Sequence, residues 1–89
     1  MKSHLTADFL TRFEGMPERI KHSARRQYRL WREDPAHPSL QFKKVGRRSE
    51  AYSVRVGIGW RALGIREGET MVWFWIGSHA EYDQIVKRI

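Results

Sequence analysis

One histidine near the C-terminus has the setting of an acid–base residue. His79 lies within Ser78-His79-Ala80-Glu81, a Ser-x-x-Glu capping box that predicts a helix beginning at the histidine. The free amides and the positive dipole end of such a helix favour a neutral imidazole, which can accept a proton near pH 7, and they also attract phosphate. His79 is therefore a candidate for proton transfer, although a histidine after a capping serine is often only a surface residue.

Two arginines, Arg55 and Arg61, flank a predicted hairpin turn and form a candidate anion site. The turn is the Gly-Ile-Gly segment at residues 57–59. If Val56 pairs with Trp60 across this turn, both arginines fall opposite each other on one face of the sheet. Like charges opposed across strands are destabilising, so the pair predicts an anion between them unless both side chains simply project into solvent.

Further side chains are candidates for contacting an anionic polymer. In the same register Phe74 lies beside Arg61, where its ring either stacks on a base or belongs to the core. Tyr82 is favoured as a core residue, although its hydroxyl is within possible reach of the site. A basic cluster near the first turn of the sheet suits phosphate contacts, and a solvated loop would look the same. This cluster consists of Lys43, Lys44, Arg47 and Arg48.

The composition indicates one basic domain, residues 1–89, with a polyanionic or acidic partner. Lysine and arginine total 17 against 10 acidic residues, a formal charge of +7, and there is no cysteine to form a disulfide. The remaining histidines show no metal-ligand spacing, so we expect no metal and no small-molecule cofactor. The N-terminus lacks the apolar core of a secretion signal, and no apolar run approaches the roughly 20 residues of a membrane span, so we expect a cytoplasmic location.

Helix signals fill the first third of the chain. Residues 5–14 predict a short helix capped by Ser3 or Thr6, and Gly15 ends it. A second helix is predicted from Pro17 to just before Pro35. Its apolar stripe has spacings of four, four and three, and basic residues occupy its other side. The stripe is Ile20, Ala24, Tyr28 and Trp31, and the basic residues are Lys21, Arg25, Arg29 and Arg32.

Strand signals follow at residues 40–43, 52–56, 60–66 and 70–76. The last of these is apolar on both faces, which predicts an internal position in the sheet. The small Ala62 and Gly64 lie together with larger side chains on the predicted sheet face opposite Arg55 and Arg61, which fits helices packing on that face. A closing helix has its stripe at Tyr82, Ile85, Val86 and Ile89. The sequence therefore predicts an α+β fold: two N-terminal helices packed on a four-stranded antiparallel sheet, with a closing C-terminal helix.

This arrangement resembles the RelE/ParE superfamily, the toxins of type II toxin-antitoxin systems. Residues 52–56 (Tyr-Ser-Val-Arg-Val) and 59–63 (Gly-Trp-Arg-Ala-Leu) resemble the family strand that carries a catalytic arginine after the hairpin turn. Residues 74–82 resemble the glycine-(Ser/Thr)-His segment of its mRNA-cleaving branch. The resemblance covers roughly residues 35–85. Many members begin with an edge strand, whereas this chain is predicted to start in a helix, and several carry paired lysines where it has Ser53 and Arg55.

The resemblance implies a ribosome-dependent mRNA endonuclease that cuts message by metal-independent attack of the 2′-hydroxyl, with a cognate antitoxin protein as partner. His79 and Arg61, backed by Arg55, would supply the base, acid and cation of that reaction, with Tyr82 nearby. Two other functions remain open: a ParE-like inhibitor of DNA gyrase, and a non-catalytic RNA-binding module. The nuclease hypothesis requires the imidazole of His79 and the guanidinium of Arg61 to converge on one phosphate.

Overall fold

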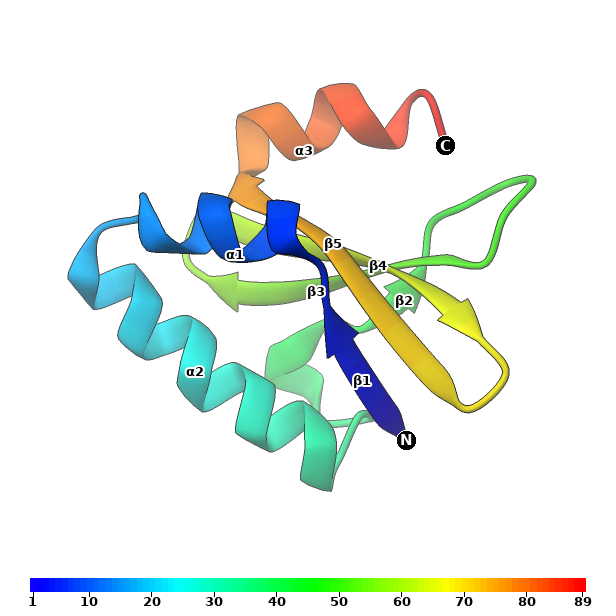
Figure 1. Cartoon of the computed structure of the whole chain (residues 1–89), viewed down its shortest axis with the longest axis horizontal. Helices are drawn as coiled ribbons and strands as arrows, with labels where there is room; N and C mark the ends of the chain where they lie inside the picture. Colours follow the sequence, from blue (N-terminus) through cyan, green and yellow to red (C-terminus); the bar gives the residue numbers. More distant parts are fainter.

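A five-stranded mixed sheet in the order β1-β5-β4-β3-β2 forms the centre of the computed structural model, which describes residues 1–89 (Figure 1). Helices α1 and α2 pack on one face of this sheet, and α3 packs on the other. The predicted α+β fold is confirmed. The strands are β1 (Lys2–Leu5), β2 (Lys43–Lys44), β3 (Ala51–Gly57), β4 (Trp60–Glu67) and β5 (Thr70–Ser78), and the helices are α1 (Ala7–Glu14), α2 (Glu18–Glu33) and α3 (His79–Val86).

The two N-terminal helices begin close to their predicted positions. Thr6 caps α1, and its hydroxyl accepts a hydrogen bond from the amide of Phe9 at 3.1 Å. Along α2, the buried residues include three of the four predicted stripe positions, and Tyr28 is half-buried. Lys21 was predicted to lie on the solvent-exposed side of the helix, and this prediction is wrong. Its stem is buried, and its ammonium lies 3.6 Å from a carboxylate oxygen of Glu14 and 3.4 Å from one of Glu18.

The sheet has one strand more than predicted. The chain does not start in a helix: β1 pairs in parallel with β5, so β5 is internal, as its apolar character predicts. Of the predicted strand at residues 40–43, only Lys43 lies in a strand, the two-residue β2, and Leu40 ends a 3₁₀ turn, Pro38–Leu40. Its apolar signal came from Leu40, which is fully buried within the turn.

Two register shifts correct the predicted pairing of side chains. Arg55 lies opposite Arg61 as expected, but Gly57, rather than Val56, pairs with Trp60. Between β4 and β5, a bulge leaves Phe74 without a partner residue, and Arg61 pairs with Gly77. Phe74 is therefore not beside Arg61, because it lies three residues before Gly77 along β5.

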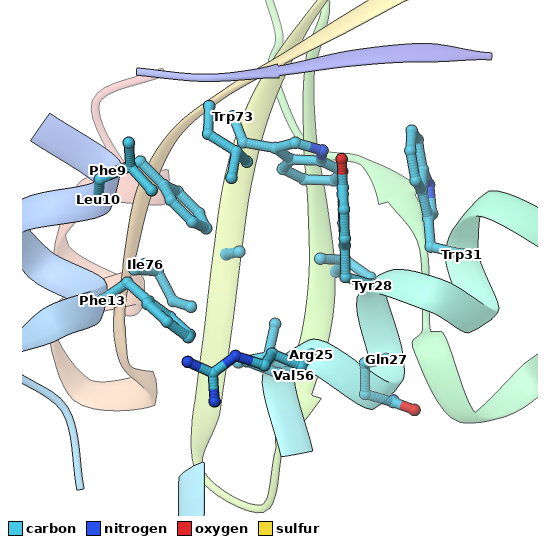
Figure 2. Close-up of a pocket in the computed structure, with 14 residues that line it drawn as sticks. Phe9, Leu10, Phe13, Arg25, Gln27, Tyr28, Trp31, Val56, Trp73 and Ile76 are labelled. Carbon is cyan, nitrogen blue, oxygen red and sulfur yellow. The ribbon is translucent and has the colours of Figure 1, made fainter. Parts of the chain in front are cut away.

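The sheet separates two apolar cores. The larger core joins α1 and α2 to the sheet, and it encloses a cavity of about 190 Å³ between the two helices (Figure 2). The smaller core lies beneath α3, where the bulge lets the consecutive Phe74 and Trp75 both face Tyr82 and the end of the chain. Among the helices, none reaches the length and apolar content of a bilayer span.

Gly64 allows the larger core to close against β4. A Cβ atom at this position would lie 2.7 Å from Cε3 of Trp73 and 2.9 Å from Sδ of Met71, both buried. We expect Gly64→Ala to reduce the free energy of unfolding by about 1–3 kcal/mol, because this overpacking forces core side chains to move. Gly15→Ala is the control, since its Cβ would meet nothing within 3.7 Å and its φ is −82°. Urea denaturation measures both, and equal stabilities would contradict the expectation.

Candidate nucleic-acid interface

An open groove of about 680 Å³ runs between α3 and the segment around β2. Six of the predicted site residues line it: Lys43, Lys44, Arg47, Arg61, His79 and Tyr82. Lys87 adds a further cation, and Asp83 is the one carboxylate residue among the lining side chains. The groove is therefore strongly positive, which suits a polyanion.

His79 is fixed at the start of α3 by the predicted serine cap. The Ser78 hydroxyl accepts from the amide of Glu81 at 3.3 Å and donates to its carboxylate at 3.1 Å. The amide of His79 donates to the carbonyl of Gly59 at 2.8 Å, which ties the helix to the β3–β4 turn. The imidazole is half-exposed, and its Nδ1 lies 3.3 Å from Oδ2 of Asp83. A carboxylate on Nδ1 favours the tautomer that leaves Nε2 free to accept a proton.

Arg61 is buried in the floor of the groove without a carboxylate partner. Only 4% of the residue is exposed. Its Nε donates to the Ser53 hydroxyl at 2.8 Å, and Nη1 and Nη2 donate to the side-chain and backbone oxygens of Gln41 at 3.0 and 3.2 Å. Burial lowers the pKa of this guanidinium, Arg55 adds to that effect, and Tyr82 opposes it. Of five guanidinium donors, two are left for Tyr82 or a ligand.

Tyr82 lies between the predicted acid–base residue and the predicted cation. Its ring centroid is 5.1 Å from Cζ of Arg61 and 5.4 Å from the centroid of the His79 ring. Tyr82 is also buried in the smaller core, so it holds both neighbours in place. His79 and Arg61 thus both contact the ring of Tyr82 and line the same groove.

Only part of the predicted basic cluster lies in the groove. Lys43, Lys44 and Arg47 line the groove, whereas Arg48 is exposed but does not. Lys44 pairs with Glu50 at 3.0 Å. The amide of Arg47 donates to the carbonyl of Ile89 at 3.0 Å, which holds the loop after β2 beside the end of the chain (Figure 1).

Two other predicted site residues lie outside the groove. Phe74 packs in the core under α3 and is half-buried there. Arg55 lines a separate depression beside α2. The sequence reasoning missed Gln41, which holds Arg61 through two hydrogen bonds. Gln41 adopts a left-handed conformation, with φ of 46°, that nothing in its local sequence indicates.

The groove combines three features that suit a phosphodiester: the buried Arg61 with neutral partners, the His79 imidazole paired with Asp83, and several lysines along its lining. Desolvation makes the uncompensated charge of Arg61 attract an entering anion more strongly than it would in water. No group of three or more histidine, cysteine, aspartate or glutamate side chains lies together as a metal site would require. These features define a small basic α+β domain with a positively charged groove beneath its C-terminal helix.

The chain belongs to the ParE-like toxin domain family, whose model it matches over residues 18–84, and with it to the RelE/ParE superfamily of toxins of toxin-antitoxin systems. Its fold is similar to that of RelE in a RelB-RelE antitoxin-toxin complex from Methanococcus jannaschii, with a TM-score of 0.73 at 14% identity over 92% of this chain and 96% of that chain. The isolated Escherichia coli RelE toxin gives 0.65 at 14% identity, over 98% and 96%. A Mycobacterium tuberculosis RelBE2 toxin-antitoxin complex gives 0.66 at 22%, over 86% and 95%. No curated protein sequence matches with significance.

Proposed function

We propose that this toxin is a ribosome-dependent mRNA endonuclease that cleaves by attack of a 2′-hydroxyl on the adjacent phosphate. The observation that carries the proposal is the placement of His79 and Arg61 around the ring of Tyr82 in one basic groove. A gyrase inhibitor has no need of a base beside a buried cation. This activity would place the protein in the cytoplasm, where translation occurs.

The proposed reaction needs no metal. The Nε2 atom of His79 takes the proton of the 2′-hydroxyl, and the 2′-oxygen then forms a bond to phosphorus. Arg61 stabilises the negative charge of the pentavalent intermediate through its free donors. The bond from phosphorus to the 5′-oxygen breaks, and that oxygen takes a proton from the Tyr82 hydroxyl or from water. The products are a 2′,3′-cyclic phosphate and a 5′-hydroxyl. Lys43, Lys44 and Arg47 hold flanking phosphates.

The test is induction of the wild type, His79→Ala and Arg61→Ala in a bacterial host, with primer extension on a translated message. The proposal expects growth arrest and new message ends in the wild type alone. Purified ribosomes programmed with the same message then separate direct cleavage from a secondary cellular response. Arrest without new ends in the wild type would contradict the proposal.

A second candidate function is inhibition of DNA gyrase, which the ParE-like description of the matching family favours. This function predicts that the wild type and His79→Ala arrest growth equally, because no proton transfer is involved. It also predicts trapped gyrase–DNA complexes. A non-catalytic RNA-binding protein would instead be harmless in every version.

We also propose that the cognate antitoxin binds with an acidic, amphipathic segment. The cavity between α1 and α2 is lined almost entirely by apolar side chains, among them Leu10 and Trp73, with Arg25 at its rim (Figure 2). The guanidinium of Arg25 lies 5.1 Å from the ring centroid of Phe13, and more arginines follow along α2. Apolar anchors of the segment would enter the cavity while its carboxylates meet these arginines.

Leu10→Glu is expected to weaken antitoxin binding at least about tenfold. Leu10 is 44% exposed at the cavity, so the change removes less than half of the about 1.5–3 kcal/mol that burying a whole leucine side chain contributes, and it adds a charge that repels an acidic partner. Because more than half of the side chain is already covered, a thermal melt of the free variant checks that the loss of affinity is not a loss of folding. Calorimetric titration with the antitoxin measures the effect. Ile58→Glu is the control, since Ile58 is 84% exposed and away from the cavity. Equal affinities for both variants and the wild type would contradict this docking site.

A further inference from the structure

A second group of cations lies outside the groove, in a depression of about 350 Å³ between α2 and the β3–β4 turn. Three arginines, Arg19, Arg26 and Arg55, line this depression, and no acidic residue does. None of the three forms an ion pair with a carboxylate anywhere in the chain. Arg19 and Arg26 are seven residues apart, two turns of α2, and so project from the same side of the helix. The depression therefore gathers two positive charges of α2 that the protein itself does not neutralise, with the backbone of Arg55 at its β3 side.

Hydrogen bonds from α2 to the end of β3 hold this depression in shape. The Ser23 hydroxyl donates to the carbonyl of Val56 at 2.7 Å. The side-chain amide of Gln27 donates to the carbonyls of Arg55 at 3.2 Å and Ser39 at 3.3 Å. The backbone that carries Arg55 is thus fixed against the helix that carries the other two arginines. Such a preformed arrangement lowers the ordering cost of binding a ligand.

We infer that Arg19 and Arg26, beside the end of β3 that carries Arg55, form an accessory site for the ribose-phosphate backbone of RNA. Only two apolar residues, Ile20 and Ile58, line the depression, so it lacks the apolar core of a protein-binding surface. Interfaces with nucleic acid are instead polar and strongly positive, and guanidinium groups match phosphate oxygens bidentately. The inference rests on RNA being the ligand of the proposed function, but not on cleavage.

The accessory site lies close enough to the groove for one RNA to contact both. Arg55 is the direct cross-strand partner of Arg61, which lies in the floor of the groove. The β3–β4 turn that borders the depression also accepts the hydrogen bond from the amide of His79. An RNA with its reacting phosphate between His79 and Arg61 can therefore place neighbouring phosphates against the depression. The bound backbone comes either from the flank of the message or from a ribosomal RNA helix.

Salt-dependent binding of RNA tests this inference. The probes are a single-stranded and a duplex 2′-O-methyl oligoribonucleotide, which cannot undergo 2′-hydroxyl attack. The variant is Arg19→Gln with Arg26→Gln, both exposed positions, and the charge-matched control is Lys2→Gln with Arg29→Gln, which line neither the groove nor the depression. On single strands, each phosphate contact adds about 0.7 to the slope of log affinity against log salt. We expect the variant to bind more weakly, with a slope shallower by about 1.4, and the control to match the wild type.

The two probes identify the source of the backbone. Loss confined to the single strand indicates the message, and loss on the duplex indicates ribosomal RNA; either result supports the site. Equal loss in the variant and the control, no loss in either, or a wild type that binds neither probe overturns the inference. So does a variant that keeps RNA binding but loses binding of a polyglutamate peptide, since the depression would then fit an acidic protein. Because the probes cannot be cleaved, failure of the proposed nuclease chemistry leaves this readout unchanged.

Discussion

Replacing His79 by alanine is expected to lower the rate at which the protein cleaves message on the ribosome by a factor of about 10² to 10⁴. The imidazole is the one side chain in the groove that combines a nitrogen free to accept a proton with a carboxylate, Asp83, that orients it. Removing it leaves the 2′-hydroxyl to lose its proton to water. Single-turnover cleavage on ribosomes programmed with a defined message measures the chemical step apart from product release.

Folding and binding should survive this change. The His79 side chain is 53% exposed, and its one polar side-chain contact is with Asp83, so we expect the free energy of unfolding to change by no more than about 0.5 kcal/mol. His22→Ala is the matched control, because His22 is an exposed histidine of α2 that does not line the groove. A His79→Ala protein that cleaves at the wild-type rate would remove the base from the proposed mechanism. In that case another group would act as the base, because message would still be cleaved.

Local sequence patterns were sufficient for most of the fold. The capping residues Thr6 and Ser78 accept hydrogen bonds from the amides that the patterns indicate, and the apolar stripe of α2 is buried. These features depend on neighbours within about one helical turn, so the sequence carries them directly. The alternation along β3 and β4 likewise predicted that Arg55 would face Arg61.

Features that depend on long-range contacts were missed. The strand β1 has only four residues, and its hydrogen bonds go to β5 about 68 residues away, so its local sequence gives little signal. The bulge at Phe74 can be recognised only after the register of β4 against β5 is known. Lys21 was predicted to be exposed because its contacts with Phe13 and Glu14 come from another helix.

The candidate site was predicted in part for the same reason. His79 and Tyr82 are three residues apart on one helix, so local geometry places them together, and the hairpin places Arg61 opposite Arg55. The contact between Arg61 and Tyr82 depends on the packing of α3 on the sheet. Gln41 reaches Arg61 from a left-handed turn that tertiary packing imposes. The accessory site joins Arg19 of α2 to Arg55 of β3, and no spacing in the sequence indicates that meeting.

The double variant Arg61→Met/Ser53→Ala is expected to lose cleavage by a factor of about 10² to 10³ without losing stability. The loss of rate follows from removing the cation that stabilises the phosphorane. The unchanged or higher melting temperature follows from the burial of Arg61, which lowers the pKa of its guanidinium below that in the unfolded chain. The group stays charged in the folded protein, so its charge costs stability at every pH below that lowered pKa, including neutral pH.

Ser53 must change together with Arg61, because the fully buried serine hydroxyl would otherwise lose its partner, at a cost of about 1–3 kcal/mol. Arg61→Met alone is therefore expected to melt below the double variant, and Ser53→Ala alone isolates the effect of the lost Nε contact. Gln41 is exposed and can turn its freed oxygens to water. Thermal melts and single-turnover cleavage on the same preparations separate the two roles. A buried cation that serves to bind phosphate should destabilise the free protein, and phosphate binding should offset that loss. If the double variant instead melts well below the wild type, the guanidinium of Arg61 stabilises the β3–β4 face, and its role is structural.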